Sequence, residues 1–300
     1  MEVYIILTDE MYLIGTSSDK LCTYLDKDYV LLKKSMPVSD SGLEGYISNI
    51  NKAFESGVKI SRVLDYRFIP NTTSSYSNGN SYTKGVFLEE RAKGEYVDRE
   101  SIVVSLKNDY DFNSIVITYL NKFIKYMNSL EKRALAPQAV FDKLVWDCKK
   151  IEEFGLQVDP KPLNFFYDES NGFSIIDVIP SSDKTDEYSL ATYIYVIVFG
   201  YGPTTLQIEH ELYLGLPKEI KEKHAKILSL LNQKIQIALF NNGFNKAVVD
   251  DVEDKQSFRY QDRYKEVDMV QMVAEIEDIY TEKKKPREPM SLDELNMTFL

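Results

Sequence analysis

Four polar residues around one short loop could together carry phosphate chemistry. Asp159, Lys161 and Asn164 fall within a single loop, and Asp177 follows at the end of the next predicted hairpin. Amide and carboxylate oxygens are hard ligands that suit Mg²⁺ holding a polyphosphate, and a nearby carboxylate suits a base that orients a hydroxyl. Two prolines in the loop stiffen it and would hold these groups in position.

The elements on either side predict that these residues converge. A predicted helix ends at Gly155 and leads into the loop 157–164. Residues 163–167 and 173–176 have strand character on either side of a polar turn that ends in Gly172, which predicts a short hairpin. The loop and Asp177 should therefore meet at one edge of that hairpin.

The rest of the chain divides into a β-rich and a helical part. Strand-like runs at 3–7, 12–14, 21–25 and 29–32 precede one helical stretch that ends at Gly57, and strand character returns at 58–68 and 86–88 around a Ser/Asn-rich loop at 71–80. Helical spacing then dominates at 115–127, 140–151, 187–199, 217–241 and 263–280. We expect an α+β protein with a β-rich lobe at 1–94, a helical lobe at 95–280 and a tail at 281–300.

Composition narrows the classes of function. Lys and Arg number 36 against 47 Asp and Glu, a net charge of −11, which argues against a nucleic-acid coat. Two cysteines, Cys22 and Cys148, give neither a disulfide framework nor zinc spacing, and a reducing cytosol is the expectation. The longest apolar run, 190–201, is shorter than the roughly 20 residues of a membrane span. No signal-peptide pattern is seen, so we expect a cytoplasmic protein or one delivered to another cell's cytosol.

Several motifs resemble those of the eukaryotic-type protein kinases. Asp159-Pro160-Lys161-Pro162-Leu163-Asn164 resembles the catalytic loop D-x-K-P-x-N, and Ile175-Ile176-Asp177 resembles the strand that ends in the metal-binding Asp. Val30-Leu31-Leu32-Lys33 is similar to V-A-I-K, and the segment from Asp186 is similar to the start of the buried central helix. The resemblance covers most of residues 10–200 and implies a two-lobed protein-kinase-like fold, with a small antiparallel β lobe carrying one helix and a larger, mainly α lobe.

The resemblance also implies a role for each residue when ATP and Mg²⁺ are bound. Asn164 and Asp177 would hold Mg²⁺, Asp159 would orient the acceptor hydroxyl, and Lys161 would neutralise the transferring phosphoryl group. Lys33 would grip the phosphates with Glu44 as its ion-pair partner, Glu55 being a weaker candidate for that partner. The phosphate loop would include Gly15 and Ser17, and the backbone at Leu88 and Glu89 would meet adenine.

The sequence departs from the kinase pattern at several places. Gln157 and Val158 replace the His-Arg before the catalytic Asp, and Val178-Ile179 replaces the Phe-Gly after the metal Asp. The phosphate loop has few glycines, and the stretch from Asp177 to Asp186 is too short for an activation segment. Control by activation-loop phosphorylation and docking of a peptide in the usual way are therefore not expected.

Three functions are compatible with these features. The first is an ATP- and Mg²⁺-dependent transferase that resembles a Ser/Thr protein kinase and acts on a hydroxyl. The alternative is a pseudokinase that serves as a nucleotide sensor or structural interaction module. A small-molecule kinase of the aminoglycoside or choline type ranks third, because such enzymes usually carry His before the Asp and lack Lys161. We expect a protein substrate or binding partner, without nucleic acid or a membrane span; the oligomeric state and the role of residues 205–300 stay open.

Overall fold

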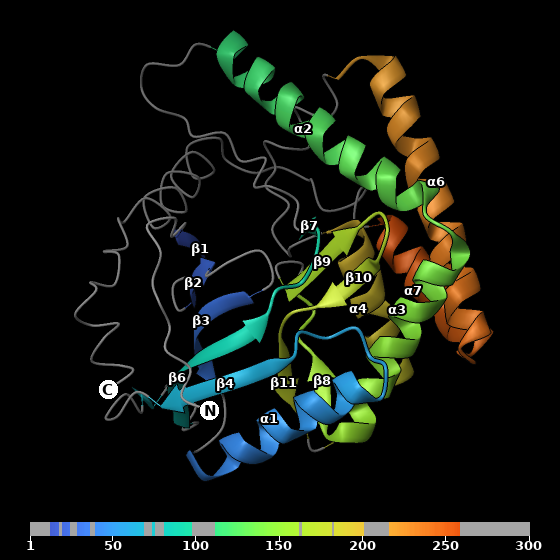
Figure 1. The fold of residues 1–300 in the computed structure, drawn as a ribbon. Helices are drawn as coiled ribbons and strands as arrows, with labels where there is room; N and C mark the ends of the chain where they lie inside the picture. The colour runs from blue at the N-terminus through green and yellow to red at the C-terminus, as the bar shows by residue number, and fades with distance from the viewer. Residues whose placement is uncertain are drawn as a thin grey trace.

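A β-rich lobe precedes a helical lobe, as the sequence predicts (Figure 1). The computed structural model describes residues 13–17, 20–24, 29–36, 40–68, 74–75, 81–97, 112–161, 164–181, 183–200 and 216–258. The predicted strand 3–7, the predicted helix 263–280 and the tail 281–300 lie outside these ranges. The predicted division at residue 94 remains a proposal.

The N-terminal lobe is built on one antiparallel sheet. Its strand order is β1-β2-β3-β6-β4, and the two-residue strand β5 also pairs with β6. The bounds are Leu13–Ser17 for β1, Lys20–Tyr24 for β2, Tyr29–Met36 for β3, Val63–Phe68 for β4, Ser74–Ser75 for β5 and Ser81–Glu90 for β6. The predicted meander is thus confirmed in β1–β3, whereas β6 begins well before the predicted residue 86 because residues 83–85 pair with β3 and residues 81–82 pair with β5.

One helix, α1 (Asp40–Glu55), accompanies this sheet, as predicted. Its apolar residues recur every three or four positions, so they form one stripe along the helix. This stripe is buried and includes Leu43, Tyr46, Ile47, Ile50 and Ala53. The helix therefore packs with that stripe inward, and it also contacts β8 and the 3₁₀ turn η1 (Ile151–Phe154) of the C-terminal lobe.

The C-terminal lobe is a group of packed helices (Figure 1). They are α2 (Phe112–Leu135), α3 (Gln138–Lys150), α4 (Glu187–Phe199), α6 (Lys218–Asn241) and α7 (Lys246–Phe258). The apolar run of α4 is buried, and Asp186 caps the helix by accepting a hydrogen bond from the amide of Ser189 at 2.9 Å. The structure confirms the predicted buried helix at 187–199, whereas α7 was not predicted.

Short strands embedded among these helices form the functional region. The predicted hairpin is present as β9 (Phe165–Asp168) and β10 (Gly172–Ile175), and β9 also pairs with β7 (Glu95–Tyr96). A second antiparallel pair joins β8 (Leu156–Val158) to β11 (Val178–Pro180) and was not predicted. No helix in the described part of the chain is both long and apolar enough to cross a membrane.

Candidate active site

The pairing of β8 with β11 brings two predicted site residues together. Val158 lies opposite Val178 in this antiparallel ladder. Asp159 directly follows Val158, and Asp177 directly precedes Val178, so both aspartates lie next to the last residue pair of this ladder. Sequence reasoning placed both at one edge of a hairpin, and the structure supplies the two short strands that do so.

Asn164 joins them at the neighbouring ladder. It precedes β9, and its carbonyl oxygen accepts a hydrogen bond from the amide of Ile176 at 2.8 Å, one residue before Asp177. The Asn164 side chain is buried, and its amide nitrogen donates to the carbonyl oxygen of Asp159 at 3.4 Å. Asn164 therefore connects Asp159, at the start of the loop, to the segment that carries Asp177.

The loop between Asp159 and Asn164 is a tight turn with a charged pair on it. The amide of Lys161 donates to the Asp159 carbonyl oxygen at 2.8 Å, and the amide of Asn164 donates to the Lys161 carbonyl oxygen at 2.8 Å. The Lys161 Nζ also lies 2.8 Å from Oδ2 of Asp159. The lysine side chain is 72% exposed and the aspartate side chain 15% exposed, so this ion pair is at the surface and contributes little stability.

A tyrosine that sequence analysis did not single out lies among these residues. Tyr46 of α1 is buried, and its hydroxyl donates to the Val178 carbonyl oxygen at 2.6 Å. Burial, followed by the negative charges of Asp177, Glu89 and Asp159, holds its pKa well above 10.0, so it stays a neutral hydroxyl donor. Only its place in the α1 stripe was visible from sequence, and that position indicates core packing rather than a role in a site.

Glu89 is a second buried residue that acts on the Tyr46 hydroxyl. Glu89 of β6 is 2% exposed, which makes it one of the few buried charged side chains among the described residues. The sequence predicted a role only for its backbone, next to Leu88, as a hinge to adenine. The structure adds that its carboxylate is within electrostatic reach of the tyrosine hydroxyl that also feels Asp177 and Asp159.

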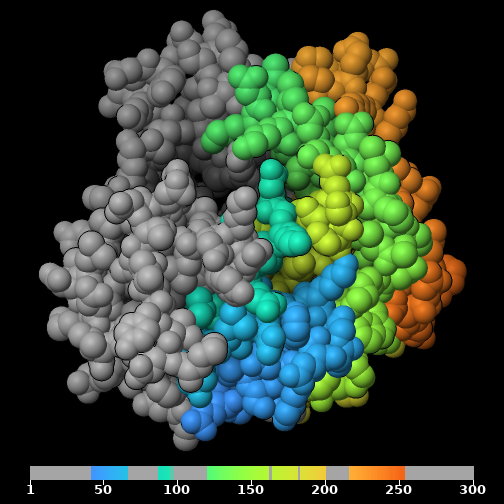
Figure 2. Space-filling model, viewed as in Figure 1, coloured from blue at the N-terminus to red at the C-terminus, as the bar shows by residue number. Residues whose placement is uncertain are grey.

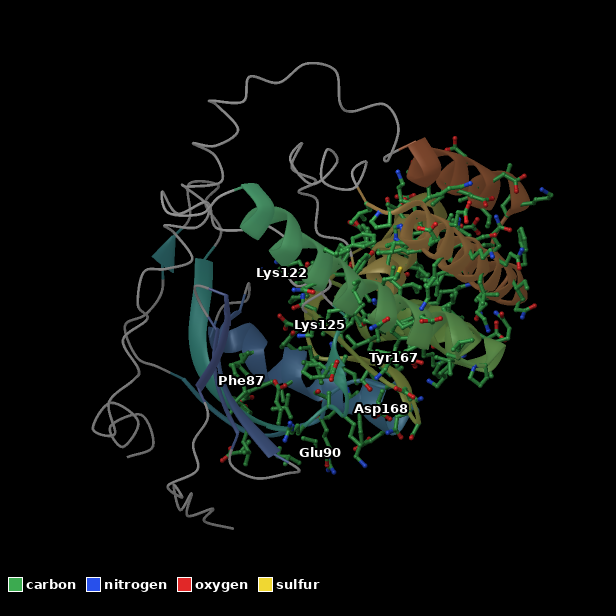
Figure 3. The ribbon with its side chains drawn as sticks, turned by 90° about the horizontal axis from the view of Figure 1, so that it is seen from above. Phe87, Glu90, Lys122, Lys125, Tyr167 and Asp168 are labelled. Carbon is green, nitrogen blue, oxygen red and sulfur yellow. The ribbon has the colours of Figure 1, made fainter. Side chains whose placement is uncertain are left out.

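The chain after β6 connects the sheet directly to the β9–β10 hairpin. Leu88 is half-buried near the end of β6, and residues 91–94 lead into β7, which pairs with Phe166 and Tyr167 of β9. Figure 3 shows the two sides of this connection, with Phe87 and Glu90 on one strand and Tyr167 and Asp168 on the other. The predicted hinge segment therefore passes from one lobe to the other.

The predicted phosphate-binding residues lie on the first three strands. Gly15 pairs with Leu21 and Ser17 pairs with Lys20 at the end of the β1–β2 hairpin, with a β-bulge between the two pairs. Lys33 pairs with Leu21 on β2 and with Val86 on β6. A bulge at a hairpin end suits a loop that approaches a ligand with its backbone.

Glu44 is exposed on α1. Burial raises the pKa of Tyr66 of β4, and the charge of Glu44 adds to this effect. Tyr66 stacks on Phe87 with ring centroids 6.4 Å apart, and Phe87 pairs with Leu32 in the row next to that of Lys33. The ion pair between Lys33 and Glu44 remains a proposal, and Glu55 is likewise exposed at the end of α1.

The donor set at Asp177 suits a magnesium ion that also binds phosphate. Among the described residues no three His, Cys, Asp or Glu side chains cluster closely enough to hold a metal by themselves. Asn164 and Asp177 instead offer one amide and one carboxylate at adjacent backbone positions. Mg²⁺ typically uses one or two protein oxygens and completes its shell with water and phosphate oxygens, so these residues fit it.

The order of elements now decides the fold. A β-rich lobe with one helix is followed by a helical lobe, in which a loop carrying Asp159 and Asn164, a hairpin, Asp177 and a buried central helix capped by Asp186 follow one another. The chain has a protein-kinase-like fold.

Comparisons with known proteins give distant structural likenesses. A pseudokinase solved without ligand is 12% identical and covers 90% of each chain at a TM-score of 0.34. An aminoglycoside phosphotransferase from Alicyclobacillus acidocaldarius is 9% identical over 93% of this chain and 94% of the other, at 0.31. An amicoumacin kinase in complex with AMP-PNP and Ca²⁺ is 14% identical over 97% and 93%, at 0.35. No family model and no curated protein matches the sequence, and likenesses at this level assign no activity.

Proposed function

We propose that the chain is a nucleotide-dependent phosphotransferase that uses ATP and Mg²⁺ and transfers a phosphoryl group to a hydroxyl. The observation that carries this proposal is the pairing of β8 with β11, which places Asp159 and Asp177 next to the last residue pair of the same ladder, with Asn164 bonded to both segments. Carboxylate and amide oxygens held close together on the backbone suit a divalent metal that also binds phosphate, which supports this proposal.

Each residue then has a definite task. Asn164 and Asp177 would hold Mg²⁺, which when bound neutralises charge on the phosphate oxygens. Asp159 accepts the hydrogen bond of the acceptor hydroxyl and so orients it. Lys161 occupies one oxygen of Asp159, Oδ2, and the second oxygen can accept the hydroxyl. As charge develops on the transferring group, the exposed ammonium of Lys161 can move toward it.

The choice of phosphate-binding lysine follows from the strand register. Directly paired residues share a face of an antiparallel sheet, and successive residues alternate. Lys33 pairs with Val86, whereas Lys34 pairs with Gly85 and so falls on the same face as Phe87 and Glu89. We propose Lys33 as the phosphate ligand from its motif and Lys34 as its competitor from the register.

The proposal is tested by calorimetric titration with ATP in the presence and absence of Mg²⁺. Wild type should bind Mg·ATP, and Asp177→Asn should weaken that binding at least about tenfold, which is about 1.4 kcal/mol. Asp183→Asn is the matched control, since it removes one carboxylate charge from an exposed position a few residues further along the same segment. Lys33→Met and Lys34→Met, titrated in parallel, identify the phosphate ligand. Equal binding by Asp177→Asn and wild type would refute the metal site.

A pseudokinase is the second candidate, and the engagement of Asp159 by Lys161 favours it. In such a protein the ion pair would hold the loop shut and the chain would bind nucleotide without turnover. The two functions differ in one assay, the release or transfer of labelled phosphate from ATP. Turnover in wild type that Asp159→Asn abolishes, with Mg·ATP binding retained, supports the transferase; binding without turnover in either supports the pseudokinase. A Ser or Thr acceptor and a cytoplasmic location remain proposals.

A further inference from the structure

The backbone around Asp177 is held from both sides by the N-terminal lobe. Two residues before it, the amide of Ile175 donates to the Lys59 carbonyl oxygen at 2.8 Å, and the Ile175 carbonyl oxygen accepts from the amide of Ser61 at 3.0 Å. One residue after it, the carbonyl oxygen of Val178 accepts the Tyr46 hydroxyl at 2.6 Å. Tyr46 lies on α1, and residues 59–61 belong to the linker between α1 and β4.

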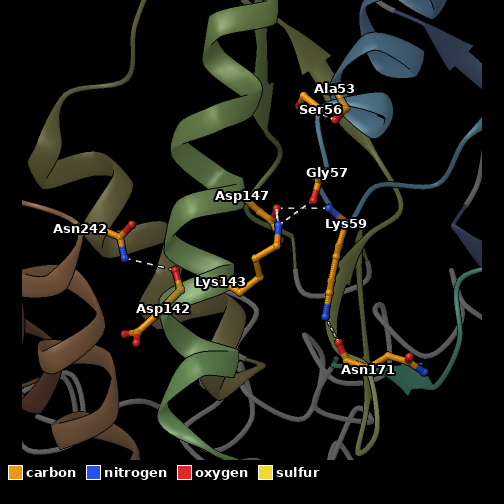
Figure 4. A network of polar contacts seen from close by, with 9 residues as sticks. All are labelled: Ala53, Ser56, Gly57, Lys59, Asp142, Lys143, Asp147, Asn171 and Asn242. Atoms are coloured by element: carbon orange, nitrogen blue, oxygen red, sulfur yellow. Dashed lines mark hydrogen bonds and ion pairs between the residues drawn. The ribbon is translucent and has the colours of Figure 1, made fainter.

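That linker is itself fixed to the C-terminal lobe (Figure 4). Asp147 of α3 is 2% exposed, and its Oδ1 accepts from the backbone amide of Lys59 at 3.2 Å and from the Lys143 ammonium. The Lys143 Nζ also donates to the Gly57 carbonyl oxygen at 2.8 Å, and the Lys59 ammonium donates to the carbonyl oxygen of Asn171. Figure 2 shows the α1 and linker residues in blue lying directly against the green and yellow-green residues of the other lobe.

The two attachments differ in what they hold. The linker attachment consists of two backbone–backbone hydrogen bonds and three hydrogen bonds that involve the side chains of Lys59, Lys143 and Asp147, so no single side chain controls it. The attachment at Val178 is a single hydroxyl of α1 that donates to the residue after Asp177. Tyr46 therefore sets where the residue after Asp177 lies relative to α1, and with it the direction of the Asp177 peptide.

We propose that Tyr46 is a positioning residue for Asp177, coupling the placement of helix α1 to metal-dependent nucleotide binding. The inference rests on the proposed function, because it takes Asp177 as the metal ligand. Tyr46 acts through the backbone of Val178 and itself touches neither phosphate nor acceptor. Val178-Ile179 stands in place of a flexible glycine-containing pair and is paired with β8, and the tyrosine adds a bond from α1 to this already paired segment.

The test compares Tyr46→Phe with Tyr126→Phe. Both variants keep a buried ring and lose one hydroxyl that donates to a backbone carbonyl oxygen, in the control that of Phe199 at 3.1 Å within the C-terminal lobe. Thermal melting should therefore fall to a similar extent in the two. Calorimetry with Mg·AMP-PNP should show a five- to tenfold weaker affinity in Tyr46→Phe only, while affinity for AMP-PNP without metal stays equal in all three proteins.

Hydrogen exchange supplies a second readout that is independent of nucleotide. Amides in residues 173–181 should exchange faster in Tyr46→Phe than in wild type or Tyr126→Phe. Unchanged exchange and unchanged Mg·AMP-PNP affinity in Tyr46→Phe, with a wild type that binds, would overturn the inference alone. A wild type that shows no metal-dependent binding would instead remove the proposed function, and the role of Tyr46 with it.

Discussion

Gly94 is the residue at which the link between the sheet and the catalytic hairpin is most sensitive to substitution. Its φ of +103° is a conformation that L side chains rarely adopt. A Cβ at this position would lie 2.1 Å from the carbonyl oxygen of Tyr167, 2.5 Å from its carbonyl carbon and 2.8 Å from the amide nitrogen of Asp168. All three atoms are backbone, so no side-chain rotation can relieve the contact, and Gly94→Ala must push residues 91–97 away from β9.

The expected cost has two parts. The left-handed backbone conformation costs a non-glycine residue about 1–2 kcal/mol. The displacement also weakens the pairing of β7 with β9 and the bond from the amide of Val97 to the Phe165 carbonyl oxygen, 3.1 Å long, at about 1 kcal/mol for each bond lost. The total for Gly94→Ala is about 3–5 kcal/mol, a large share of the 5–15 kcal/mol that typically stabilises a domain.

Gly57→Ala is the matched control, because it introduces a side chain at a positive φ without a contact between that side chain and other backbone atoms. Gly57 has φ +93°, and a Cβ there would meet nothing within 4 Å. Its cost should be about 1–2 kcal/mol, from the backbone alone. Both variants are measured by urea unfolding followed through the fluorescence of Trp146, the single tryptophan of the chain. Equal losses of unfolding free energy in the two variants would refute the reasoning, since the contact with β9 would then contribute nothing.

Three further predictions concern charged and reactive groups. Asp159→Asn should leave Mg·ATP affinity within about threefold of wild type in calorimetry while abolishing phosphate release, and a parallel loss of both would contradict its assigned role. Burial raises the pKa of the Asp147 carboxyl from 3.8, although Lys143 acts in the opposite direction. The raised pKa contributes to the free energy of unfolding in full below pH 3.8, and this contribution is lost as pH rises through the raised pKa. The melting temperature of wild type relative to that of Asp147→Asn should therefore decrease as pH rises above about 4. Melting temperatures that change in parallel with pH in the two proteins would contradict this. Burial, then Asp147 and Glu152, raises the pKa of the Cys148 thiol, so in a Cys22→Ser background a disulfide reagent should label it only as fast as the chain unfolds.

The elements that the sequence predicts well are those whose pattern is local. The apolar stripe of α1, the capped and wholly apolar α4, and the polar turn between β9 and β10 each follow from spacing within one segment. The kinase-like order of these elements then places Asp159, Asn164 and Asp177 in one region, and the backbone pairing agrees with that placement.

Features that depend on pairing between distant segments could not be predicted in the same way. The strands β8 and β11 have three residues each, which is too short to show the alternation of apolar and polar residues that predicts a strand. They form because they pair with each other. In the sequence Tyr46 has the position of a core residue. Only the structure shows that its hydroxyl donates to the carbonyl oxygen of Val178, 132 positions away. In the sequence Glu89 is a polar residue at the end of a predicted strand. Only the structure shows that it is buried and that its charge acts on the Tyr46 hydroxyl.

The gathering of Asp159, Asp177 and Glu89 around a neutral hydroxyl determines which ligand the site can accept. Each of these carboxylates raises the pKa of the Tyr46 hydroxyl. A nucleotide polyphosphate that approaches Asp159 and Asp177 without a cation would be repelled by their charges. A divalent cation makes the electrostatic interaction between the nucleotide and the site favourable, since both the carboxylates and the phosphates attract it. Metal-free ATP should therefore bind much more weakly than Mg·ATP, and this difference should shrink in Asp177→Asn, because removing one carboxylate weakens both the attraction of the metal and the repulsion of the phosphates.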